Sequence, residues 1–431
     1  MLAAVERALE DEPFVAIGVH SPKFPNERDP EMVREAVRRY GVTHPVVVDS
    51  GMRIWQRYGV NAWPTLVLVD AEGEIAGAGS GEPDADALLA AVRRVIDEGR
   101  RRGTLRGAPL PLRREASVPG SLAYPGKVIA DDSRVFVADT GHDQIVVCDA
   151  DGAERYRIGS GEPGLVEGSR EAARFRHPNG MALARDTLYV ADTGNHAVRA
   201  VDLRRGAVST VARSLRSPWD IACDGTLLYV AMAGSHQIHA YELGSHALRR
   251  FAGTGYERCV DGPAGVACFA QPSGLVLDGG VLYVADSEVS SVRAIDDLHG
   301  SPAVRTVCGS GELFGFGDRD GISSAALLQH PMGIAAGGGR LFVADTFNHK
   351  VKVVDPASGE CRTLFGDGTP ERLAELVPGK PLRAAAAGEP AFFEPDGLAW
   401  REGELLVADT NNHRVLAVSI ADGARRVLVG E

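Results

Sequence analysis

Two sets of side chains suited to metal binding or proton transfer recur beyond residue 135. The aspartates are Asp139, Asp192, Asp286, Asp345 and Asp409, and the histidines are His142, His196, His236, His349 and His413. A zinc ion would need several of them to converge at about 2 Å. Because they belong to separate repeated segments, we expect them around a wide ring, too far apart to share an ion. We predict structural roles, with each aspartate bonding the backbone of its own turn.

The six cysteines are the other candidates for chemistry, and all lie beyond residue 147. They are Cys148, Cys223, Cys259, Cys268, Cys308 and Cys361. Cys259 and Cys268 share one predicted loop, where accessible thiols could pair or act as a redox switch. Two free thiols in a reducing cytoplasm are the alternative.

The sequence contains no complete catalytic motif. It has no G-x-S-x-G, no H-E-x-x-H and no Walker lysine. The G-x-G-x-x-G match at 159–164 has no strand–helix–strand unit around it. We therefore expect no catalytic residue, no metal and no cofactor in the chain as given.

A unit repeated six times positions these residues. Each unit has Val-Ala, a polar turn and an alternating apolar stretch, which predicts two short strands joined by a tight turn. The six segments are 136–147, 189–201, 229–241, 283–295, 342–354 and 406–418. Most have a Pro-x-Gly-apolar segment upstream and another strand downstream. Four strands per unit and six units predict a β-propeller.

Four insertions lengthen the connections between units, at 159–178, 253–272, 309–331 and 366–395. In a blade of four antiparallel strands, these connections and the aspartate turns lie at the same end. We expect one loop-rich face that binds a protein or a small molecule. Its candidate contact residues are Phe314, Phe316, Phe392 and Phe393.

The Tyr/Phe-Val-Ala-Asp-Thr-x-Asn-His-x-Val units, with Pro-x-Gly upstream, resemble NHL repeats. The resemblance covers residues 121–431 and implies an all-β six-bladed propeller.

The first third has a different pattern. It predicts strands at 14–21 and 45–49, helices at 29–42 and 84–101, and a strand introduced by Trp63-Pro64-Thr65. This order resembles the distal part of an α/β thioredoxin-like domain over 1–103. The resemblance implies that Pro64 is the family's cis proline and that Trp63, Pro64 and Thr65 are a docking site.

The same resemblance implies a first strand and a Cys-x-x-Cys turn, and the chain has neither. We expect an N-terminally incomplete domain, either because the start lies downstream of the true one or because the module has degenerated. We favour the first, since an incomplete sheet would expose an apolar edge. A thioredoxin-like module, a linker at 104–120 and an NHL propeller together resemble the NHL repeat-containing protein 2 family.

The negative net charge argues against two classes of partner. The 46 Lys and Arg against 58 Asp and Glu give a net charge of −12, which disfavours nucleic acids and anionic membranes. The acidic first residues lack the features of a signal peptide. We expect a cytoplasmic monomer.

Three functions are compatible with these observations. We favour a non-catalytic interaction protein that binds a protein or small ligand through the loop-rich face, with a redox-inactive thioredoxin-like module. The alternative is a thiol-disulfide oxidoreductase whose active-site segment is missing from this chain. The third is a metal-dependent propeller enzyme.

Overall fold

The computed structural model describes residues 2–81, 83–105, 120–373 and 382–430. The chain forms two compact units, Met1–Val118 and Pro119–Glu431. Most of the predicted linker, 104–120, lies outside the described residues. No helix of the described residues is long and apolar enough to cross a membrane.

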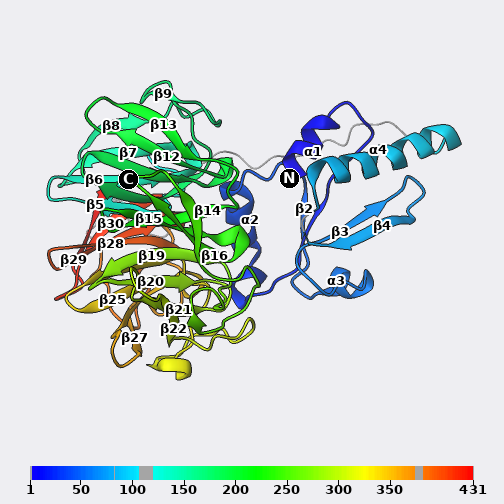
Figure 1. The fold of residues 1–431 in the computed structure, drawn as a ribbon. Coiled ribbons are helices and arrows are strands. Elements are labelled where there is room, and N and C mark those ends of the chain that lie inside the picture. Colours follow the sequence, from blue (N-terminus) through cyan, green and yellow to red (C-terminus); the bar gives the residue numbers. More distant parts are fainter. Residues whose placement is uncertain (1, 82, 106–119, 374–381, 431) are drawn as a thin grey trace. The chain divides into compact units, whose positions relative to one another are not determined.

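The first unit has the predicted α/β thioredoxin-like order of elements (Figure 1). They are α1 (Leu2–Ala8), β1 (Gly18–His20), α2 (Pro30–Arg39), β2 (Val46–Val48), α3 (Arg53–Arg57), β3 (Thr65–Val69), β4 (Ile75–Ser80) and α4 (Ala85–Arg102). β1 and β2 pair in parallel, and β3 and β4 form an antiparallel hairpin. The described strands of this unit thus make two separate two-stranded sheets.

The core of the first unit is small. Among the described residues, its one cluster of buried apolar residues lies on α1 and α4 and in the turn after α1, and comprises Val5, Leu9, Val92 and Ile96. Phe24, Met32 and Val33 are buried outside this cluster. Strand residues remain exposed, for example Val19 at 42% and Ile75 at 59%. This unit therefore buries little apolar surface for its length.

The second unit is a six-bladed propeller, which confirms the predicted fold (Figure 1). Blade 1 is β5 (Val128–Ala130), β6 (Arg134–Asp139), β7 (Gln144–Asp149) and β8 (Glu154–Ile158). Blade 2 is β10 (Pro178–Ala184), β11 (Thr187–Asp192), β12 (Ala197–Asp202) and β13 (Ala207–Ala212). Blade 3 is β14 (Pro218–Cys223), β15 (Leu227–Met232), β16 (Gln237–Glu242) and β17 (Leu248–Ala252). Blade 4 is β19 (Pro272–Asp278), β20 (Val281–Asp286), β21 (Ser291–Asp296) and β22 (Ala303–Cys308). Blade 5 is β24 (Gly333–Gly337), β25 (Arg340–Asp345), β26 (Lys350–Val354) and β27 (Glu360–Phe365). Blade 6 is β28 (Pro395–Arg401), β29 (Glu404–Asp409), β30 (Arg414–Ser419) and β31 (Arg425–Val429).

Three insertions add a fifth strand to the blade that follows them. These strands are β9 (Gly168–Ser169), β18 (Gly262–Pro263) and β23 (Gly321–Ile322). They pair antiparallel with the outer strands of blades 2, 4 and 5. Parts of these insertions thus run along blade edges, which the sequence did not predict.

The propeller core is divided among the junctions between blades. Six clusters of buried apolar residues each combine residues of two neighbouring blades, and one of them joins blade 6 to blade 1. The Val-Ala strands supply many of these residues because they are buried on both faces. The ring is therefore closed by the same kind of apolar packing at every junction.

Candidate functional site

The five turn aspartates are fully buried and anchor the chain that enters their own blade. One carboxylate oxygen, Oδ1, accepts a backbone N–H at 2.6–2.8 Å from a residue sixteen positions upstream; the donors are Ala123, Arg176, Ala270, Gln329 and Phe393. The predicted bond to the backbone of the same turn is wrong. Each turn closes on itself instead, as in the bond from the N–H of His349 to the carbonyl of Thr346 at 3.1 Å.

In blades 2, 4 and 5 the second carboxylate oxygen faces a buried cation. Arg199 lies 3.0 Å from Asp192, Arg293 lies 3.0 Å from Asp286, and Lys352 lies 4.0 Å from Asp345. Arg293 also donates to the carbonyl oxygens of Cys268 and Val260, which ties the insertion to its blade. Burial raises the pKa of Asp286 to about 6 and that of Asp345 to about 7, although the nearby cations oppose the shift. These aspartates hold loops in place rather than face solvent.

A second set of polar contacts joins each blade to the next. The residue that ends the turn after the second strand of each blade has a left-handed backbone, and its side chain accepts a backbone N–H of the next blade at 2.6–3.2 Å. The acceptors are Asp143, His196, His236, Ser290, His349 and His413. Their donors, in the same order, are His177, Ser217, Gln271, His330, Glu394 and Tyr124. Four of the five turn histidines thus act through Nδ1 as acceptors between blades.

Hydroxyl groups reinforce five of these junctions. Thr140, Thr193, Ser287, Thr346 and Thr410 donate to the carbonyl oxygens of Pro178, Pro218, Pro331, Pro395 and Pro125 at 2.6–2.8 Å. The bonds to Pro125 and Tyr124 close blade 6 onto blade 1. The Asp-Thr-x-x-His motif is therefore a latch between blades.

The inner strands crowd the propeller axis, and this explains the Pro-x-Gly segments. A Cβ atom on Gly333 would lie 1.9 Å from the carbonyl oxygen of Asp396 in the next blade. Blades 1 and 3 depart from the pattern, with Lys127 and Asp220 at the glycine position. Their side chains turn to the axis instead.

Lys127 forms a buried ionic cluster there. Its Nζ lies 3.1 Å from Asp396 Oδ1 and 3.8 Å from Asp220 Oδ2, and it donates to the carbonyl oxygen of Met332 at 2.6 Å. Asp220 also accepts the backbone N–H of Leu275 at 2.9 Å. Burial raises the pKa of Asp220 to about 6, against the effect of Lys127. One ammonium group thus links blades 1, 3, 5 and 6.

The axial cluster bears on the metal-enzyme hypothesis. Among the described residues, no group of three or more His, Cys, Asp or Glu side chains is arranged to hold a metal ion. At the axis, the ammonium group of Lys127 lies between the carboxylates of Asp220 and Asp396 and offsets one of their two charges. The sequence carried a signal for this cluster, because Lys127 and Asp220 are opposite charges that replace glycine in two repeats.

The predicted face contacts divide into two pairs. Phe314 is 69% exposed and Phe316 is half-buried. Phe392 and Phe393 are 0% and 4% exposed, so the prediction that they contact a partner is wrong. Phe392 packs in the cluster between blades 5 and 6. Sequence reasoning missed other exposed apolar residues of the insertions: Leu165, Val166, Tyr256, Val260, Val266, Ile322 and Leu373.

The two loop cysteines take different partners. The Sγ of Cys268 lies 2.9 Å from the hydroxyl of Thr254, and that of Cys259 lies 3.6 Å from the hydroxyl of Thr306. All six cysteines are free thiols. Burial raises the pKa of Cys259, which disfavours its thiolate. A redox pair therefore stays a prediction.

In the thioredoxin-like unit, Trp63-Pro64 is a cis peptide bond. Trp63 is 42% exposed, its ring lies 4.1 Å from that of Trp55, and its indole N–H donates to the carbonyl of Ser21. The hydroxyl of Thr65 donates to the carbonyl of Ala62. The candidate docking tripeptide thus presents one large apolar side chain to solvent.

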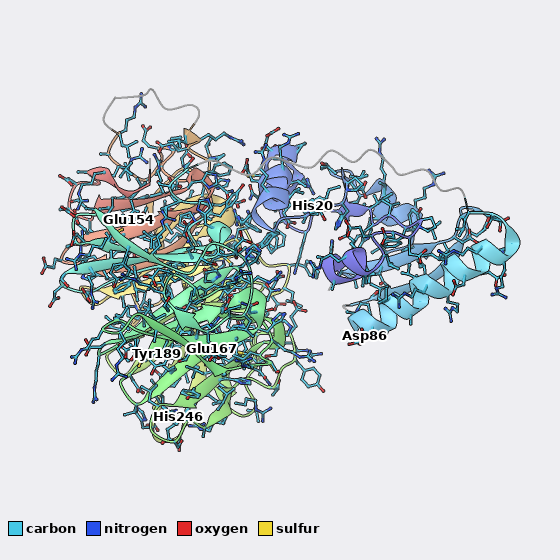
Figure 2. The ribbon with its side chains drawn as sticks, turned by 90° about the horizontal axis from the view of Figure 1, so that it is seen from above. His20, Asp86, Glu154, Glu167, Tyr189 and His246 are labelled. Carbon is cyan, nitrogen blue, oxygen red and sulfur yellow. The ribbon has the colours of Figure 1, made fainter. Side chains whose placement is uncertain are left out.

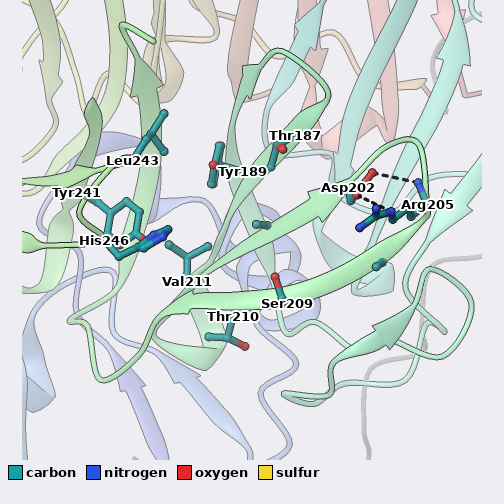
Figure 3. Close-up of a pocket in the computed structure, with 12 residues that line it drawn as sticks. Thr187, Tyr189, Asp202, Arg205, Ser209, Thr210, Val211, Tyr241, Leu243 and His246 are labelled. Atoms are coloured by element: carbon teal, nitrogen blue, oxygen red, sulfur yellow. Dashed lines mark hydrogen bonds and ion pairs between the residues drawn. The ribbon is translucent and has the colours of Figure 1, made fainter. Parts of the chain in front are cut away.

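The outer part of the propeller has a groove of about 630 Å³ between blades 2 and 3. Tyr189 comes from blade 2 and His246 from the turn before β17 (Figure 2). Figure 3 shows Tyr241 and His246 on one side of the groove, with Ser209 and Thr210 of β13 on the other. The hydroxyl of Tyr241 lies 2.7 Å from Nδ1 of His246. No motif in the sequence indicated this groove.

Comparison with known proteins gives the following similarities. The model of the NHL repeat matches residues 175–200 and 269–295. Human NHL repeat-containing protein 2 is 37% identical over 97% of this chain and 64% of its own length. The chloroplastic protein SUPPRESSOR OF QUENCHING 1 of Arabidopsis thaliana is 38% identical over 98% of this chain and 43% of its own. The thiol-disulfide oxidoreductase ResA of Halalkalibacterium halodurans is 39% identical over 51 residues, 12% of this chain and 29% of its own. The chain thus spans less than two thirds of the two long relatives.

Proposed function

The chain is a homologue of NHL repeat-containing protein 2 along nearly its whole length, and on that premise we propose that it is a non-catalytic interaction protein whose propeller insertions bind a partner. Lys127 at the axis and the five turn aspartates are engaged in structural contacts, which supports binding rather than catalysis. In the proposal, the thioredoxin-like unit is a docking module without redox chemistry.

One observation carries this proposal. Eight of the ten large apolar side chains exposed on the described part of the propeller lie in the four insertions, and only Leu248 and Val427 lie on blade strands. Tyr256 is 72% exposed and Val266 59%. Exposed apolar residues concentrated on one set of loops are typical of a protein-binding surface.

The experiment compares two sets of substitutions in the full chain. Tyr256→Ser with Val266→Ser is expected to reduce partner recovery in quantitative affinity purification. Val427→Ser, which changes an exposed valine outside the insertions, is expected to leave recovery unchanged. Equal recovery of every partner by both variants would contradict the proposal.

A second candidate function is thiol-disulfide exchange, favoured by the similarity to ResA. In that case the redox cysteines come from a segment outside these residues. Insulin reduction by a protein extended by the upstream coding sequence tests it. Activity that persists after replacement of every upstream cysteine by serine would argue against this function.

We also propose a cytoplasmic location. Six unpaired thiols support a reducing compartment. Cell fractionation of a tagged protein checks this location, and recovery outside the cytosolic fraction would contradict it.

A further inference from the structure

Among the described residues, blades 1, 3 and 6 lack an element that the other three blades have. Blades 2, 4 and 5 each carry a two-residue fifth strand, supplied by the insertion that precedes them. Blade 3 has no such insertion, and β17 is the last strand of its sheet. No described strand pairs with the outer edge of β17, which is therefore an open hydrogen-bonding edge.

The fifth strands share one chemical pattern. Each begins with glycine, and the residue before it is acidic, as in Glu167-Gly168, Asp261-Gly262 and Asp320-Gly321. The carboxylates accept the outward backbone N–H of a threonine on the outer strand; the pairs are Glu167–Thr210 at 3.2 Å, Asp261–Thr306 at 3.0 Å and Asp320–Thr363 at 2.9 Å. An acidic residue followed by glycine is thus what the edge of a blade binds in this fold.

The register identifies the matching positions in blade 3. Thr210, Thr306 and Thr363 lie opposite Arg199, Arg293 and Lys352. Arg250 lies opposite His239 in the same register, so its N–H points away from β16. Leu248 lies two residues before Arg250, as Val208, Val304 and Cys361 lie two residues before the three threonines. Those three are 0–3% exposed beneath their fifth strands, whereas Leu248 is 37% exposed.

The other members of the motif have changed together in blade 3. Met232 replaces the turn aspartate and His239 replaces the buried cation. The Nδ1 atom of His239 is buried, and the described residues offer it no hydrogen-bond partner. Arg249 and Arg250 are exposed, and neither has an ion-pair partner among the described side chains. This edge therefore combines an uncovered leucine, an outward N–H and two positive charges.

Two hollows lie beside this edge. The groove shared with blade 2 includes Leu243 and His246 from the segment leading to β17 (Figure 3). A smaller hollow of about 250 Å³ includes Ala247, Arg249 and His299. Side chains of an added strand alternate between the two faces of a sheet, so each hollow can take some of them.

We propose that β17 binds an extended segment of a partner protein in which an acidic residue is followed by glycine. The segment adds to blade 3 as an antiparallel fifth strand. Its carboxylate accepts the N–H of Arg250 and pairs with the arginine side chains, and its glycine covers Leu248. This binding edge is distinct from the insertion surface of the proposed function.

The test uses a fluorescein-labelled peptide with the sequence of residues 164–171, Gly-Leu-Val-Glu-Gly-Ser-Arg-Glu, titrated with the full chain. We expect saturable fluorescence anisotropy. The same peptide with Glu167→Gln is expected to bind about tenfold more weakly, because it loses a charge-assisted hydrogen bond. Equal binding of the two peptides would overturn the proposal.

Two substitutions of Arg250 distinguish the contribution of its backbone N–H to binding from that of its side-chain charge. Arg250→Pro removes the outward N–H but leaves the inner ladder intact, since proline is tolerated where the N–H faces solvent. It is expected to abolish binding. Arg250→Thr restores the residue of the sister blades, keeps the N–H and is expected to weaken binding by a few-fold.

Arg426→Thr, which changes an exposed arginine on the outer strand of blade 6, is the control and is expected to bind like the parent protein. Thermal melting checks that all three variants fold. Undiminished binding by Arg250→Pro, or the absence of saturation, would overturn the proposal. A dimer of the chain that Arg250→Pro dissociates would replace the partner by a second copy and would also overturn it. The insertion variants Tyr256→Ser with Val266→Ser should bind the peptide normally, so the two proposals can fail independently.

Discussion

In both units aspartate carboxylates accept backbone N–H groups, but the pKa of the carboxyl group shifts in opposite directions. In the thioredoxin-like unit, Asp49 accepts backbone N–H groups of Arg53, Ile54 and Trp55 at the start of α3. Burial acts to raise its pKa, but these bonds prevail and the pKa of Asp49 is lowered. In the propeller, burial prevails and the pKa of Asp345 is raised to about 7. Several donors at a helix start favour the charged form, whereas deep burial penalises it even beside a cation.

The two units also differ in how their apolar residues are packed. The propeller buries apolar residues at all six junctions and adds polar latches at each. The first unit has one small cluster between α1 and α4 and leaves alternate strand residues exposed. The propeller should therefore tolerate less change at single positions but resist unfolding better.

The largest expected effect comes from removing a latch carboxylate. Asp286→Ala removes one of the two carboxylates that pair with buried Arg293 and also removes the acceptor of the Ala270 N–H, so it should lower the free energy of unfolding by about 3–5 kcal/mol. Urea unfolding followed by hydrogen–deuterium exchange measures this in the propeller, with the thioredoxin-like unit unchanged. Asp186→Ala removes a carboxylate that is 51% exposed and should change stability by about 0.5 kcal/mol or less. A similar loss in both variants would contradict the latch.

Substitutions of different members of the axial cluster should change the free energy of unfolding by different amounts. Lys127→Met leaves two buried carboxylates and should cost about 3 kcal/mol. Asp220→Asn removes the carboxyl group whose pKa burial raises to about 6, so it should be nearly neutral at pH 7.5. Urea midpoints of the two variants decide this, and a larger loss for Asp220→Asn would show that Lys127 is not the central member.

Acid should act in opposite directions on the two units. The pKa of Asp345 is higher in the folded than in the unfolded chain, so the folded form binds more protons between pH 3.8 and about 7. Its contribution to the free energy of unfolding should fall as pH rises through that window. Asp345→Asn should remove this dependence.

Asp49 contributes in the reverse direction, because its lowered pKa gives stability that is lost as pH falls below about 4. Stability measured at several pH values for Asp345→Asn and Asp49→Asn tests both signs. Parallel pH profiles for the two differences would contradict the contrast between the units.

The smallest effect compares one substitution at two depths. Val190→Thr places a hydroxyl in the fully buried cluster between blades 1 and 2 and should cost about 1–2 kcal/mol. Val19→Thr on β1, where valine is 42% exposed, should change stability by about 0.5 kcal/mol or less. Thermal melting of the two variants measures the difference.

The repeats made the propeller predictable, because the same pattern of strand and turn occurs six times and each copy supports the others. The position of the aspartate turns was predicted, but not their partners. The N–H bound by Asp409 belongs to Phe393, and no local rule links those two residues. Phe392 and Phe393 were misjudged for the same reason: a loop position in sequence does not exclude burial by the next blade.

The axial cluster and the uncovered β17 were visible only as exceptions to the repeat. Lys127 and Asp220 stand where glycine is expected, and Met232 stands where aspartate is expected. The recurring pattern identified the fold. The contacts of these three exceptional residues depend on neighbours from other blades, which spacing along the chain does not specify.

The junction between blades 6 and 1 has one further consequence. His413 and Thr410 hold Tyr124 and Pro125 with the bonds used at the other junctions, and no described strand is exchanged between the first and last blades. The same kinds of contact thus hold every junction of the ring. The covalent connection between two neighbouring blades can therefore be replaced by a latch at any junction. A circular permutant that joins the two ends of the propeller and opens between blades 2 and 3 would present the same surfaces from a reordered gene.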